Sequence, residues 1–70
     1  EYDKAIISFQ SAIELNDQFA DAYRGLGISY FYSEQYEEAK IHFQKARELF
    51  LKQNNPKAVN EIQSYLINIP

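Results

Sequence analysis

The sequence contains no cysteine, and this absence excludes a disulfide framework and thiol chemistry. It leaves the cellular compartment unknown, with the cytoplasm as the default expectation. No apolar run approaches the roughly 20 residues that a membrane-spanning helix needs, and no signal-peptide pattern opens the chain. We therefore expect no insertion into a membrane.

Basic charge is also scarce, since 7 Lys and Arg stand against 10 Asp and Glu, for a net charge of −3. Surfaces that bind nucleic acid or anionic lipid normally carry excess positive charge, so neither partner is expected. The single histidine, His42, is interpreted as a partly exposed residue on a helix surface, and without cysteines it makes no metal site. Gly25 and Gly27 lie within a predicted helix rather than in a phosphate-binding loop. The sequence therefore predicts no enzyme activity, no cofactor and no metal.

The residues that are present form amphipathic patterns. With 46% hydrophobic and 24% charged residues, the composition is that of a small globular domain. Apolar residues recur at helical spacing in successive segments that are separated by short polar breaks. The predicted helices cover residues 1–16, 20–33, 34–52 and 56–69.

Polar residues at the breaks predict how the helices begin. Asp17 or a neighbour is expected to cap the second helix, and Ser33 the third, which we place from Glu34 onward. Asn55 is expected to cap the last helix, with Pro56 at its first position, where the missing amide hydrogen costs nothing.

Two matching motifs lie at the centre of the chain. The first is Tyr23-x2-Leu26-Gly27-x2-Tyr30, and the second is Tyr36-x2-Ala39-x3-Phe43-x2-Ala46. The second motif also occurs 34 residues earlier, as Tyr2, Ala5, Phe9 and Ala12. Both motifs and this period resemble the tetratricopeptide repeat, with Tyr23 in place of the leading tryptophan.

The resemblance implies an all-α array of antiparallel helix hairpins, with about one and a half repeats and a C-terminal capping helix. Residues 1–16 would be the second helix of a truncated repeat, 20–52 a complete repeat, and 56–69 the cap or the first helix of another repeat. Gly27 would permit close approach of the two helices of the complete repeat, whereas Gly25 is either tolerated or widens the inner surface. Because the chain opens at Glu1 without methionine, we interpret it as a fragment of a longer array.

In this family the first helix of each repeat lines a concave groove that binds a protein or peptide. The positions that would face the groove are Asp21, Arg24, Ile28, Phe31 and Tyr32, with a possible extension at Lys57, Asn60, Ser64, Ile67 and Asn68. The resemblance thus implies a scaffold or adaptor module. A clamp for a terminal carboxylate is disfavoured, because Ile28 occupies the position where such clamps carry asparagine. The alternative for the groove residues is that the capping helix or a second copy of the chain covers them.

A rival function is self-assembly. The first helix carries an apolar strip of Ile6, Phe9 and Ile13, whereas Lys40 and Arg47 replace two of these residues one repeat later. If this strip lacks a partner within the chain, it would pack on another copy and give a homodimer or a higher oligomer.

Overall fold

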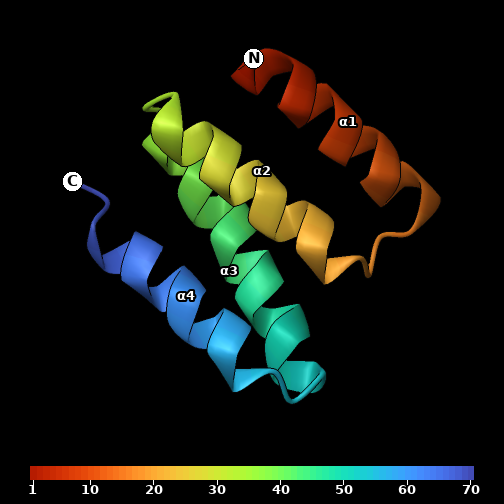
Figure 1. Ribbon diagram of the computed structural model, residues 1–70, viewed down its shortest axis with the longest axis vertical. Helices are drawn as coiled ribbons and strands as arrows, with labels where there is room; N and C mark the ends of the chain where they lie inside the picture. The colour runs from red at the N-terminus through yellow and green to blue at the C-terminus, as the bar shows by residue number, and fades with distance from the viewer.

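The computed structural model describes all residues, 1–70, as a chain of helices without strands. Consecutive helices run antiparallel, so that α2 and α4 point in the same direction (Figure 1). Together they form a thin body of 32 × 30 × 15 Å. This arrangement confirms the predicted all-α helical hairpin fold. The helices are α1 (Tyr2–Leu15), α2 (Ala20–Tyr32), α3 (Tyr36–Lys52) and α4 (Pro56–Ile67).

The core lies where α2, α3 and α4 meet. Its largest fully buried side chains are Phe43, Leu26 and Ile62, one from each of these helices. The fully buried Ala39 and Ala46 lie on the same face of α3 as Phe43, because residues three and four apart share one side of a helix. These positions belong to the repeated motif, and their small side chains let the neighbouring helices approach.

Gly27 of α2 packs directly against Phe43 of α3. A Cβ atom at this position would lie 2.5 Å from Cδ1 and 2.8 Å from Cγ of the Phe43 ring. Such distances are too short for nonbonded carbon atoms, so the packing of Phe43 requires glycine here. Gly27 is therefore needed for close packing, as predicted, but the group that approaches it is the Phe43 ring rather than the backbone of α3.

Gly25 has a similar role on the opposite side of α2, which the sequence did not predict. A Cβ atom at Gly25 would overlap the outer end of the Phe9 ring from α1. The glycine therefore makes room for α1.

The apolar strip of α1 packs within the chain, which corrects the expectation that it lacks a partner. Ile6 is buried in the core, and Phe9 and Ile13 are half-buried and pack against it. The physical reason is that α1 folds back along α2, whose Gly25 leaves space for an aromatic ring. Other apolar residues of α1, Ile7 and Leu15, are exposed instead.

The first two predicted helix caps are wrong. The residue before α2 is Phe19, without a side-chain cap, while the backbone carbonyl of Asp17 accepts a hydrogen bond from Tyr23 at 3.2 Å. Ser33 ends α2 rather than starting α3, and its hydroxyl donates to the Tyr30 carbonyl at 3.1 Å. Glu34 has a φ of 64°, a left-handed conformation that cannot begin a helix,.

The third predicted cap is confirmed. The Asn55 side chain accepts a hydrogen bond from the Ala58 amide at 3.2 Å, and Pro56 occupies the first position of α4. Asn54 before it has a φ of 55°, a conformation that asparagine tolerates better than most residues.

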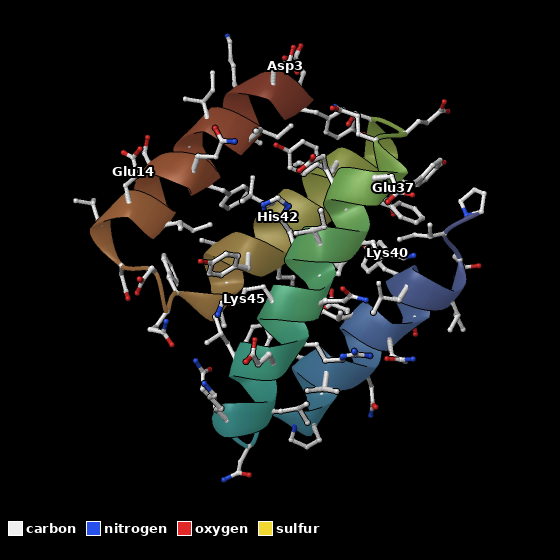
Figure 2. All side chains as sticks on the ribbon, turned by 180° about the vertical axis from the view of Figure 1, so that it is seen from behind. Asp3, Glu14, Glu37, Lys40, His42 and Lys45 are labelled. Atoms are coloured by element: carbon white, nitrogen blue, oxygen red, sulfur yellow. The ribbon has the colours of Figure 1, made fainter.

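His42 is half-buried on α3, close to its interpretation as a partly exposed helix residue. Its ring stacks on Tyr30 at a centroid distance of 5.3 Å, and Nδ1 lies 2.8 Å from the Glu38 carbonyl. A carbonyl oxygen only accepts hydrogen bonds, so Nδ1 carries a proton. Figure 2 shows this face of the molecule, with His42 on one side of α3 and the exposed residues Glu37 and Lys40 on the other. The ring therefore has a packing role.

Candidate partner-binding groove

An open groove of about 600 Å³ lies between the C-terminal halves of α2 and α4. The two helices run in the same direction (Figure 1), so that the end of each contributes to the same part of the surface. Both apolar and polar side chains face the groove. Its lining residues are Phe31, Tyr32, Glu61, Ser64, Tyr65 and Asn68.

Three aromatic rings form one wall of the groove. Phe31 lies 5.2 Å from Tyr65 and 5.2 Å from Tyr32, with interplanar angles of 75° and 80°. Tyr32 and Tyr65 lie 6.2 Å apart at 89°. The three rings are thus nearly perpendicular to one another, and we call them the aromatic corner. Tyr32 is 53% exposed, so the corner is open to a ligand.

Tyr65 connects the aromatic corner to the hydrophobic core. Its ring stacks on that of Phe43, with a centroid distance of 5.0 Å and an angle of 18°. The side-chain contact with Tyr32, loss of solvent and the charge of Glu61 raise the pKa of Tyr65 to about 12. The phenol therefore stays neutral at physiological pH.

Arg24 connects α2 and α4 farther along the same face. Its guanidinium lies 2.7 Å from Oδ1 of Asp21 and 3.1 Å from Oε1 of Glu61. It also lies over the Phe50 ring, 5.1 Å from the centroid. Exposed ion pairs contribute little to stability, but these contacts orient Glu61 toward α2. Arg24 is consequently occupied by partners within the chain.

The structure brings together only part of the predicted concave face. Phe31, Tyr32 and Ser64 line the groove with Asn68. Ile28 instead packs against the core, and Asp21 and Arg24 lie nearer the start of α2. The extension positions Lys57 and Asn60 are exposed but do not line the groove, and Ile67 is also exposed.

Two groove residues were missed by sequence reasoning. They are Tyr65 and Glu61, neither of which was among the predicted groove positions. Glu61 could have been predicted from its negative charge, which is opposite to that of Arg24. The two residues form an ion pair between α2 and α4. The alternative that α4 covers the predicted residues is partly correct, because Tyr65 packs directly on Phe31.

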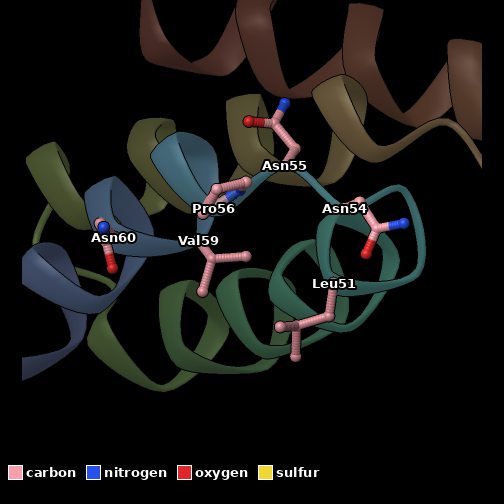
Figure 3. A pocket seen from close by; sticks show the side chains of 6 residues that line it. All are labelled: Leu51, Asn54, Asn55, Pro56, Val59 and Asn60. Carbon is pink, nitrogen blue, oxygen red and sulfur yellow. The ribbon is translucent and has the colours of Figure 1, made fainter.

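A second pocket, of about 420 Å³, lies at the turn between α3 and α4. Figure 3 shows Leu51 and Val59 on its apolar side and the side chains of Asn54, Asn55 and Asn60 around them. No pair of these residues carries charge or catalytic chemistry. The pocket is a consequence of the tight turn that Asn55 and Pro56 impose.

No group of three or more His, Cys, Asp and Glu residues could hold a metal ion. No helix is both long and apolar enough to cross a bilayer.

Comparisons with known proteins agree with the geometry. The family model described as tetratricopeptide repeat matches residues 20–58, more than half of the chain. The chain is also 39% identical over 49 residues to anaphase-promoting complex subunit 3 of Schizosaccharomyces pombe, which covers 70% of this chain but only 7% of that protein. No solved structure gave a significant match. On the strength of the family match and the helical hairpins, the chain belongs to the tetratricopeptide repeat family.

Proposed function

We propose that the chain is a scaffold module that binds a segment of another protein in the groove between α2 and α4. Its family consists in general of protein–protein interaction modules without catalytic function. The observation that carries the proposal is the aromatic corner, because partly exposed aromatic side chains in a groove are typical anchors for a protein partner. The related protein is by name a subunit of a complex, which supports a role in assembly.

The proposed repeat organisation follows from the same reasoning. Residues 20–52 would form the complete repeat, and α1 would be the second helix of another repeat. Residues 56–69 would act as the cap, because Tyr65 and Ile62 cover the open side of the hairpin. In this proposal α4 supplies the second wall of the groove.

Peptide selection tests the proposed function. Peptides selected from a displayed library for binding to the chain should shift the amide NMR signals of α2 and α4, and Tyr32→Ala should weaken their binding about tenfold. Ile41→Ala is the matched control, since Ile41 on α3 is 56% exposed and lies outside the groove. Peptides that depend on Ile41 but not on Tyr32 would refute the groove as the binding site.

Self-assembly is a second candidate, favoured by the exposed apolar side chains of α1. Ile7 is 63% exposed and Leu15 is 90% exposed, although single exposed apolar residues are common on monomers. Sedimentation equilibrium should then give a dimer that Ile7→Asp weakens by about tenfold or more. Ile13→Asp is not a suitable variant, because Ile13 packs on the core. A wild-type chain that stays monomeric at high concentration would exclude this candidate.

A further inference from the structure

We infer that the groove binds a lysine side chain of the partner segment. The lysine would lie between the aromatic corner and the polar wall, which is formed by Glu61, Ser64 and Asn68. The inference deepens the proposed function and rests on it. It uses three independent properties of the site: the arrangement of the rings, the hydrogen-bonding state of the polar wall, and the direction of the two helices. Each of them favours a positively charged donor.

The aromatic corner can attract a cation through the ring faces that are not already stacked on Phe43 or Tyr2. Phe31, Tyr32 and Tyr65 meet at angles of 75° to 89° and all line one groove. The face of an aromatic ring carries partial negative charge, so a cation within about 6 Å of the centroid is stabilised. The aliphatic part of a lysine side chain can also cover the apolar rings while its charged end reaches the polar wall.

The polar wall of the groove offers acceptors and almost no donors. The Ser64 hydroxyl donates to the Asn60 carbonyl at 3.2 Å, and the Asn68 amide nitrogen donates to the Ser64 carbonyl at 2.8 Å. The lone pairs of Ser64 Oγ and Asn68 Oδ1 therefore remain for a ligand. Glu61 accepts from Arg24 through Oε1, which leaves its Oε2 atom free.

An ammonium group matches this wall in hydrogen-bonding capacity. It has three donors and no acceptor, and the wall supplies acceptors from Glu61, Ser64 and Asn68. A carboxylate or phosphate would find acceptors instead of donors and would be repelled by Glu61. The wall thus selects for lysine against an acidic ligand.

The dipoles of α2 and α4 add negative electrostatic potential at the same end of the groove. Tyr32 is the last residue of α2, and Asn68 directly follows the last residue of α4, so both C-terminal ends lie at this part of the groove (Figure 1). Helix C-termini carry partial negative charge and favour nearby cations. The basic residues of α2 and α4 do not cancel the effect, since Arg24 is paired with Asp21 and Glu61 and Lys57 lies in the first turn of α4, at its opposite end.

The experiment is an NMR titration of the isotope-labelled chain with blocked tripeptides Gly-X-Gly. In these peptides X is lysine, acetyllysine, or norleucine, whose shorter aliphatic side chain has no ammonium group. The lysine peptide should shift the amide signals of residues 30–33 and 61–68 and bind about tenfold more tightly than either neutral peptide. Equal binding of the three peptides, or shifts elsewhere in the chain, would overturn the inference.

Two variants and a matched control test the assignment of roles. Glu61→Gln should weaken the lysine peptide about fivefold but leave the norleucine peptide unchanged, whereas Tyr32→Ala should weaken both. Glu14→Gln removes an exposed carboxylate from α1, away from the groove (Figure 2), and should have no effect. Preserved dispersion of the amide spectrum confirms that each variant is folded. An equal loss in Glu61→Gln and Glu14→Gln would reduce the effect to net charge and contradict the site.

The experiments distinguish a wrong lysine preference from a wrong proposed function. If selected peptides without any basic residue bind in the groove and depend on Tyr32, the scaffold function holds and the lysine preference is wrong. If neither the selected peptides nor the tripeptides shift α2 and α4, the proposed groove itself is refuted.

Discussion

Replacing Phe43 with alanine is expected to abolish cooperative folding of the chain. Phe43 is 0% exposed and contacts both neighbours of α3, with Gly27 of α2 on one side and Tyr65 of α4 on the other. Truncating a buried phenylalanine costs about 3–5 kcal/mol. In a domain of this size a single hydrophobic core rarely supplies more than about 3–5 kcal/mol, so the loss takes away most of the stability. Thermal unfolding followed by circular dichroism should lose its sigmoidal transition.

Two further variants separate this effect from a general sensitivity to mutation. Phe43→Leu keeps most of the buried volume and should cost about 1–2 kcal/mol, with the transition retained. Ile41→Ala, two residues earlier on the exposed side of α3, should stay within about 0.5 kcal/mol of the wild type. A cooperative transition for Phe43→Ala with less than about 1 kcal/mol lost would show that Phe43 does not hold the three helices together.

Much of this core could be predicted from the sequence, because the spacing of the repeated motif places its residues on one helix face. The equivalent residues Phe9 and Phe43 nevertheless have different burial. Phe43 lies between α2 and α4 and is fully buried, whereas Phe9 packs mainly against α2 and remains half-buried. The motif predicts which face packs, but the neighbouring helices determine how completely that face is covered.

The turn between α2 and α3 could not be predicted in the same way. Serine favours the start of a helix, but Ser33 lies at an end, because the backbone turns at Glu34 through a left-handed conformation. That conformation usually requires glycine or asparagine, and neither is present. The hydrogen bond from the Gln35 amide to the Tyr30 carbonyl, at 2.8 Å, closes the turn and compensates for the unfavourable residue.

The groove was predicted on α2 and only in part on the α4 side, where Ser64 and Asn68 were predicted but Glu61 and Tyr65 were not. Phe31 and Tyr32 follow directly from the position of the motif within its helix. The positions on α4 follow from counting Pro56 as the first residue of a repeat, and this register includes Ser64 and Asn68. Glu61 and Tyr65 each follow a predicted position by one residue, which is a rotation of about 100° around the helix, and they were therefore missed.

Replacing Gly27 with alanine is expected to destabilise the chain by about 1–3 kcal/mol, although alanine is the better helix former. The higher helix propensity of alanine is worth up to about 1 kcal/mol. The new methyl group would lie 2.5 Å from the Phe43 ring near its attachment point, and a fully buried ring has no free space to move into. Urea unfolding monitored by circular dichroism should show a lower midpoint with an unchanged slope.

Gly25→Ala is the matched comparison, since it adds the same methyl group two residues away on the same helix. Here the methyl group meets only the outer end of the half-buried Phe9 ring, which can rotate toward solvent. The gain in helix propensity then offsets most of the cost, and the change in stability should stay within about 1 kcal/mol. Equal losses in the two variants would mean that loss of glycine itself, rather than the contact with Phe43, determines the effect.

The two variants should also differ in ligand binding. Because Phe43 stacks on Tyr65, only Gly27→Ala should displace the aromatic corner. The folded Gly27→Ala variant should therefore bind groove ligands more weakly, whereas Gly25→Ala should bind them normally.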